Sequence, residues 1–140
     1  MSSIIKSQSI KQAVIKCVSL YKIFGDNPEL MLRKSIDSVN AKEFQDAGYV
    51  VGVNNASFEV YKGDMLVVMG LSGSGKSTLL RCISRLTEAT SGKIFIDGED
   101  LLSMNNKQLI ELRRNKMGMV FQSFALLPHK TVSEKIAKTF

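Results

Sequence analysis

This sequence of 140 residues has little of what marks several large protein classes. Its two cysteines, Cys17 and Cys82, stand far apart without the spacing of metal ligands, so we expect buried thiols at both positions. The longest apolar run, residues 65–71, is far shorter than the roughly 20 residues of a membrane span. Lysines interrupt the N-terminus too often for a secretory signal. The sequence therefore predicts a cytosolic location.

The sequence also has no long segment that carries charge of only one sign. The net charge is +6 and the isoelectric point is near 9.4, but the basic residues are spread along the chain. The one dense cluster, Arg113, Arg114 and Lys116, is typical of a solvated helix face. We therefore expect no nucleic-acid partner. A hydrophobic content of 44% with 23% charged residues is ordinary for one globular domain.

A glycine-rich motif near the middle of the chain is its most informative feature. Residues 70–78 read GLSGSGKST and match the pattern G-x-x-x-x-G-K-[ST]. An apolar run, residues 65–69, precedes the motif, and a segment of helical periodicity follows it. This strand-loop-helix context favours a phosphate-binding loop over the alternative, a glycine-rich turn that happens to contain Lys-Ser.

Each residue type in the motif suits the binding of a polyphosphate. Glycines let the backbone turn several N–H groups toward one anion, and the helix that follows adds its positive end. The Lys76 ammonium can follow the β- and γ-phosphates, while the Ser77 hydroxyl can complete the coordination of Mg²⁺. The residues expected to bind nucleotide are Gly70, Ser72, Gly73, Ser74, Gly75, Lys76, Ser77 and Thr78.

Strands are predicted on both sides of this loop. β-branched and aromatic residues indicate a strand over residues 13–24, and alternation of apolar with polar residues indicates another around residues 56–61. Residues 65–69 are apolar at every position, which is typical of a parallel strand covered on both faces. After the loop helix, with Leu79, Cys82, Ile83 and Leu86 as its apolar stripe, turns at 90–92 and 97–98 predict a β-hairpin.

Helices are predicted in two further places. In an insertion over residues 26–49, Asn27 and Pro28 start one helix, with Leu32, Ile36 and Val39 on one face, and Asn40 caps a second with Phe44 as its apolar anchor. A third helix is predicted over residues 101–115, where Leu109, Ile110 and Leu112 have helical spacing, followed by a strand over residues 117–121.

These motifs, in this order, resemble the nucleotide-binding subunit of an ATP-binding-cassette transporter. The resemblance covers about residues 13–137 and is carried by Phe24-Gly25, GLSGSGKSTLL, TSGKIFIDGEDL and MGMVFQSFALLPHKTV. The insertion and the stretch YKIFGDNPEL narrow it to the ATPases of glycine betaine, proline and choline importers. It implies an α/β P-loop NTPase fold with an antiparallel β arm. Residues 1–12 would be a loose tail and residues 13–140 a truncated nucleotide-binding domain.

The resemblance also implies roles and partners. Phe24 would stack on adenine, although a core phenylalanine is as consistent with the sequence, and Gln122 would reach Mg²⁺ or the attacking water. His129 would have a surface or interface role and would not be the switch histidine. The cofactors would be ATP and Mg²⁺. The partners would be a transmembrane permease subunit and a second ATPase subunit, at the cytoplasmic face of the inner membrane.

The sequence lacks three family motifs that follow the Q-loop glutamine, Gln122. It has no apolar strand ending in Asp-Glu (Walker B), no Leu-Ser-Gly-Gly-Gln signature and no later switch histidine. Hydrolysis needs an acidic Mg²⁺ ligand and a residue that positions water, so whether the chain is itself an enzyme stays open. We expect an N-terminal fragment of an importer ATPase. The alternatives are a nucleotide-binding remnant without hydrolysis and a soluble P-loop kinase or NTPase.

Overall fold

A computed structural model describes residues 12–35, 39–120, 131 and 133. The chain divides into two compact units, one up to Met104 and one from Asn105 onward. No helix in the part of the chain that is described has the length and hydropathy needed to cross a bilayer.

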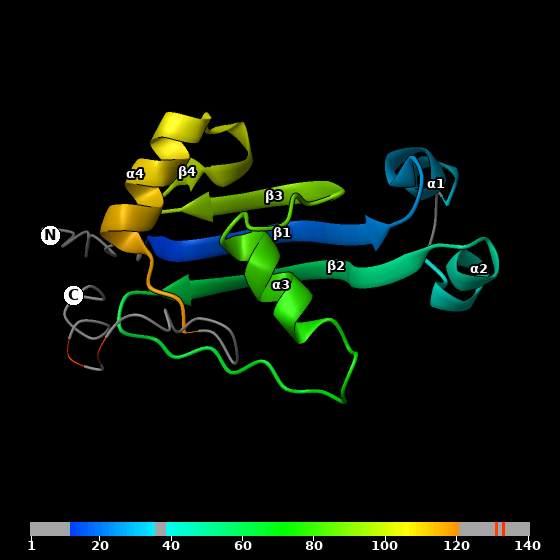
Figure 1. Cartoon of the computed structure of the whole chain (residues 1–140), viewed down its shortest axis with the longest axis horizontal. Coiled ribbons are helices and arrows are strands. Elements are labelled where there is room, and N and C mark those ends of the chain that lie inside the picture. Colours follow the sequence, from blue (N-terminus) through cyan, green and yellow to red (C-terminus); the bar gives the residue numbers. More distant parts are fainter. Residues whose placement is uncertain (1–11, 36–38, 121–130, 132, 134–140) are drawn as a thin grey trace, which may run out of the picture. The chain divides into compact units, whose positions relative to one another are not determined.

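The first unit is built on an antiparallel sheet of four strands. The strands are β1 (Ala13–Phe24), β2 (Val50–Tyr61), β3 (Ser91–Ile96) and β4 (Glu99–Asp100), and they lie in the order β2-β1-β3-β4 (Figure 1). The predicted strand over residues 13–24 and the predicted hairpin are confirmed. The second strand begins earlier than expected, at Val50. The buried apolar residues of the sheet are Cys17, Leu20, Ile23, Val53, Ile94 and Ile96.

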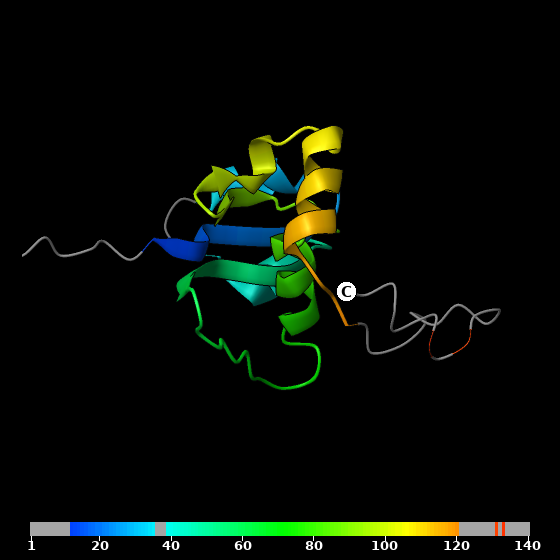
Figure 2. The ribbon, with the colours of Figure 1, turned by 90° about the vertical axis from the view of Figure 1, so that its left-hand side faces the viewer.

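Helix α3 (Lys76–Ile83) follows the glycine-rich loop and packs on β1 and β2 (Figures 1 and 2). Cys82 is its fully buried residue. The predicted apolar stripe extends too far, because Ser84 ends the helix and Arg85 has a left-handed backbone, φ 50°. Leu86 therefore lies beyond the helix and is 49% exposed.

Two short helices, α1 (Pro28–Lys34) and α2 (Ala41–Asp46), lie between β1 and β2, where the sequence predicts them. The Asn40 side chain accepts a hydrogen bond from the Lys42 N–H at 3.0 Å, and Phe44 is buried, as expected. Asn27 occupies the N-cap of α1 without a side-chain capping bond. Ile36 lies outside the described residues.

The apolar segment over residues 65–69 does not form the predicted parallel strand. It has no regular structure, and its side chains are exposed, Met65 to 88% and Met69 to 85%. A strand with no polar face needs paired neighbours and cover on both faces, and every strand pair among the described residues is antiparallel and made elsewhere. The strand predicted at 117–121 is also wrong for residues 117–120, while Phe121 lies outside the described residues.

The helix predicted over residues 101–115 is divided in two by separate caps. Asp100 accepts a bond from the Leu102 N–H and starts the 3₁₀ helix η1 (Leu101–Ser103) in the first unit. In the second unit, Asn105 and Gln108 form a reciprocal capping box that starts α4 (Asn106–Lys116). Leu109 and Leu112 are buried as predicted, and Ile110 is 55% exposed.

Candidate nucleotide-binding site

The glycine-rich loop joins the apolar segment to the start of α3. Gly73 and Gly75 have φ values of +78° and +87°, in the left-handed region, and the Ser74 N–H donates to the Leu71 carbonyl at 3.2 Å. Left-handed residues within such a turn aim successive N–H groups to one side, which makes an anion-binding concavity. The structure brings the predicted loop residues together here: Gly70, Ser72, Gly73, Ser74, Gly75, Lys76, Ser77 and Thr78.

The Lys76 ammonium lies inside the loop. Its Nζ donates to the carbonyl oxygens of Gly70 at 2.9 Å and Leu71 at 2.6 Å, and to Ser74 Oγ at 3.3 Å. These three acceptors hold the positive charge at the N-terminal end of α3, where the helix dipole also favours an anion. The Lys76 charge and the N-terminal end of α3 therefore lie together at the loop.

The loop touches β2 through two glycines. A Cβ at Gly75 would lie 1.9 Å from the Gly52 carbonyl oxygen, so only glycine fits at position 75. Gly52 was not among the predicted site residues. A single glycine inside a strand pattern, Val51-Gly52-Val53, is the signal that could have identified a close backbone approach.

Phe24 meets the loop at the same glycine. A Cβ at Gly52 would lie 2.8 Å from Phe24 Cε2 and 3.0 Å from Thr78 Cγ2, so the ring edge and the Thr78 methyl group converge there. Lys22 Nζ lies 4.8 Å from the centre of the Phe24 ring. Phe24 is 42% exposed, and it is therefore not the core phenylalanine of the alternative interpretation.

A cavity of about 380 Å³ lies between the loop, β2 and the first residue of α2. This volume is within the range of small-molecule sites. Its lining combines the polar loop with apolar side chains: Ala41, Val51, Gly52, Val53, Asn54, Ala56, Val68, Met69, Ser74, Gly75, Lys76 and Leu79.

The residues present fit Mg²⁺ only together with a polyphosphate. Ser77 is exposed in the first turn of α3, beside the Lys76 charge. No group of three or more His, Cys, Asp or Glu side chains that could hold a metal occurs among the described residues. Mg²⁺ commonly takes one or two protein ligands and fills its octahedron with phosphate oxygens and water. Gln122, the other predicted ligand, lies outside the described residues.

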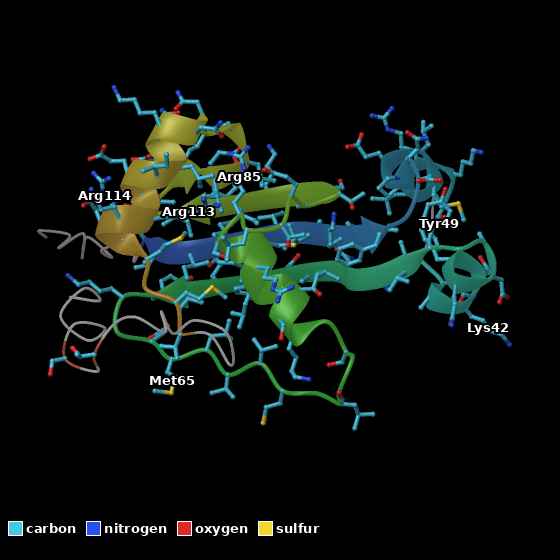
Figure 3. The ribbon with its side chains drawn as sticks, in the orientation of Figure 1. Lys42, Tyr49, Met65, Arg85, Arg113 and Arg114 are labelled. Atoms are coloured by element: carbon cyan, nitrogen blue, oxygen red, sulfur yellow. The ribbon has the colours of Figure 1, made fainter. Side chains whose placement is uncertain are left out.

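Arg85 fixes the end of α3 and was missed at the sequence level. Its Nη1 donates to the carbonyl oxygens of Leu101 at 3.1 Å and Met104 at 2.5 Å, and its Nε pairs with Glu88 Oε1 at 3.0 Å (Figure 3). These carbonyls lie in and just after η1, where carbonyl oxygens at a helix end need donors from outside the helix. The arginine thereby ties the loop helix to the segment that follows the hairpin.

The two cysteines are buried thiols, as predicted. Burial, together with the nearby Cys82 thiol, raises the pKa of Cys17 to about 11. Burial also raises the pKa of Cys82. A thiol that stays neutral is a poor nucleophile and a poor metal ligand, so neither cysteine contributes chemistry to the site.

A family model described as "ABC transporter" matches residues 53–139. Among curated proteins, the chain is 78% identical over 124 residues to the trimethylamine N-oxide transport system ATP-binding protein TmoW of Pelagibacter ubique, covering 89% of this chain and 36% of that protein. It is 49% identical over 125 residues to the glycine betaine transport ATP-binding protein OpuAA of Bacillus subtilis, covering 89% of this chain and 30% of that protein.

A solved structure gives the same result for the fold. It is a dimeric ATP-binding cassette in a post-hydrolysis state with ADP and Pi bound, and it matches with a TM-score of 0.66 at 27% identity. The match covers 87% of this chain and 44% of that one. The chain thus spans about a third of the length of its curated relatives and under half of the solved cassette.

Proposed function

This chain belongs to the ABC transporter family, and we propose that it binds Mg-ATP as part of an importer for small methylated amines. The proposal of a nucleotide site rests mainly on one observation. The Lys76 ammonium is held by two loop carbonyls at the N-terminal end of α3, beside left-handed Gly73 and Gly75. Such a combination of charge, helix end and glycine backbone is suited to a triphosphate.

Within this proposal each predicted residue has one task. The loop from Gly70 to Thr78 holds the phosphates, and the Ser77 hydroxyl takes one position on Mg²⁺. When bound, Mg²⁺ would neutralise phosphate charge. Phe24 offers an exposed aromatic face to adenine, and Gln122 reaches the metal or the attacking water. The exposure of Phe24 beside Thr78 supports its part.

Loss of the Lys76 charge tests the nucleotide site. In the full-length polypeptide that carries this sequence, Lys76→Ala should weaken Mg-ATP binding by about a hundredfold, since a charge-assisted contact is worth about 1.5–3 kcal/mol. Lys93→Ala, which removes an exposed lysine from β3, is the matched control and should leave affinity unchanged. Equal Mg-ATP binding by wild type and Lys76→Ala in a calorimetric titration would refute the site.

The transported substrate is proposed from the relatives. Two relatives named for trimethylamine N-oxide are 78% and 52% identical, and three named for glycine betaine are 46–49% identical. Both compounds are small amines that carry three methyl groups on nitrogen. We infer that the importer takes this class, with trimethylamine N-oxide preferred. The initial expectation of a glycine betaine, proline and choline importer is thereby extended to trimethylamine N-oxide.

Transport also requires partners. We propose a transmembrane permease subunit and a second ATPase subunit, with the chain at the cytoplasmic face of the membrane. The dimeric state named for the solved cassette supports the second subunit. Deleting the gene should abolish ATP-dependent uptake of labelled trimethylamine N-oxide, and restoring Lys93→Ala but not Lys76→Ala should recover it. Uptake that persists unchanged after deletion would contradict the transport role.

A further inference from the structure

Tyr49 lies at the point where the helical insertion returns to the sheet, beside the end of β1 (Figure 3). Its hydroxyl donates to the Asp26 carbonyl at 2.7 Å, and its N–H donates to the Phe44 carbonyl at 2.8 Å. The rings of Tyr49 and Phe44 meet edge to face, with centroids 6.1 Å apart. Since Phe44 is 1% exposed, Tyr49 is anchored to the buried part of the insertion.

The ring of Tyr49 covers Gly25, the residue directly after Phe24. A Cβ at Gly25 would lie 2.4 Å from Tyr49 Cδ1, and the φ of Gly25 is +144°. Only a residue without a side chain lets an aromatic ring lie so close to the backbone. The hydroxyl bond to Asp26 fixes the next residue as well. Tyr49 therefore clamps the chain immediately beyond Phe24.

The strand end that carries Phe24 is also held from the other side. Phe24 pairs with Val50, next to Tyr49, and Thr90 Oγ1 accepts from the Ile23 N–H at 2.9 Å. The Phe24 side chain itself is 42% exposed, with its ring edge near Gly52 and the Lys22 ammonium 4.8 Å from its ring centre. Its position therefore depends on the backbone on either side more than on side-chain packing.

We propose that Tyr49 is a positioning residue that places the Phe24 ring for stacking on the nucleotide base, and that the insertion serves as its brace. This inference rests on the proposed function, because it needs a base to be bound at Phe24. The contacts of Tyr49 are with Gly25, Asp26 and Phe44, so its effect on the nucleotide passes through Phe24. It should change binding of the base and leave binding of the phosphates unaltered.

Two probes separate base from phosphate binding: Mg-ATP and inorganic tripolyphosphate with Mg²⁺. In the full-length polypeptide, Tyr49→Leu keeps an apolar contact with Phe44 but removes the planar ring over Gly25. It should weaken Mg-ATP binding about tenfold, comparable with the loss of one base-stacking contact, and change tripolyphosphate binding by less than about twofold. Tyr49→Phe keeps the ring and should restore most of the affinity. Tyr61→Ala, at the opposite end of β2, is the control and should change neither probe.

The double variant Phe24→Ala with Tyr49→Leu tests whether Tyr49 acts through Phe24. It should bind Mg-ATP no more weakly than Phe24→Ala alone, because the positioned ring is already gone. Equal weakening of both probes by Tyr49→Leu, additive losses in the double variant, or no loss at all would each overturn the inference while leaving the phosphate site intact. A wild type that binds neither probe would overturn the proposed function and this inference together.

Discussion

Gly75 of the phosphate-binding loop lies against Gly52 of β2 so closely that a Cβ at Gly75 would stand 1.9 Å from the Gly52 carbonyl oxygen. The loop is thus held by backbone-to-backbone contact with a strand that precedes it in the chain. This contact places the loop, α3 and the Phe24 ring around one strand position. The following predictions test how far that arrangement determines binding and stability.

Gly75→Ala should destabilise the fold much more than an alanine at a glycine where the left-handed backbone is the only source of strain. Gly63, in the turn after β2, provides the matched control: its φ is +88°, against +87° at Gly75, but nothing lies within 4 Å of an added Cβ. Gly63→Ala should cost about 1 kcal/mol for the left-handed backbone. Gly75→Ala should cost about 1–3 kcal/mol more because the strand must move.

The measurement is the free energy of unfolding in urea, together with Mg-ATP affinity. Gly75→Ala should lower both the free energy of unfolding and the affinity for Mg-ATP, whereas Gly63→Ala should leave the affinity unchanged. If the two variants are equally stable and bind equally well, the loop does not rest on β2 as the structure has it.

A polypeptide of residues 1–140 should show no ATP turnover. Gln122 can orient a water molecule, but hydrolysis also needs an acidic group near Mg²⁺. This sequence has no apolar strand that ends in Asp-Glu. Phosphate release should stay at the background rate. A steady release that disappears in the Lys76→Ala control would show that another group in these residues acts as the base.

The alkaline pH dependence of stability should include a contribution from Cys17. Its pKa rises from 9.0 to about 11 in the folded state, since burial and then the Cys82 charge disfavour the thiolate. Between these values the unfolded chain binds fewer protons than the folded one, so stability falls as pH rises. The contribution is fully present below pH 9, and its loss by pH 11 amounts to at most about 2–3 kcal/mol.

Cys17→Ala removes this titration. Unfolding measured from pH 8 to 11 should therefore show a shallower decline for the variant than for wild type, whatever the offset between them at neutral pH. Parallel declines would mean that the thiol has the same pKa in both states. Both proteins should be measured in the same full-length polypeptide.

Local patterns were sufficient to predict the antiparallel part of the fold. The strand over residues 13–24 and the Asn40 cap depend on neighbouring residues, and both are where the sequence predicts them. The motif of the loop likewise depends on spacing alone, and Gly73 and Gly75 have the left-handed backbone that glycine permits. These features need no information from distant parts of the chain.

What the sequence did not predict depends on contacts between distant residues. Gly52 matters because Gly75 and Phe24 approach it, and Arg85 matters because it meets carbonyls in and after η1. The single glycine in Val51-Gly52-Val53 indicates a close approach but not its partners, and no local pattern marks the contacts of Arg85. Residues 65–69 are the reverse case, a strand that was predicted but does not form. Their composition suits a strand, but a strand also requires paired neighbours, which composition does not reveal.

That segment leads to a last prediction, on the solubility of a polypeptide of residues 1–140. Met65, Met69 and Leu71 are each at least 85% exposed, within a continuous apolar stretch. Such a stretch, which belongs to no strand of the described sheet, favours pairing with another chain. The polypeptide should aggregate at micromolar concentrations, and light scattering should increase with concentration.

Charge placed in the stretch should reduce this aggregation. Met69→Lys adds a like charge to every copy and interrupts the apolar run, so scattering should fall. Leu30→Lys is the control, because Leu30 is also exposed, at 57%, but belongs to a run of only three apolar residues on the short helix α1. A lysine there should change scattering little. If wild type is monomeric and unfolds in one sharp thermal transition, the stretch is covered in solution, and the exposed segment is not the state that the isolated polypeptide adopts.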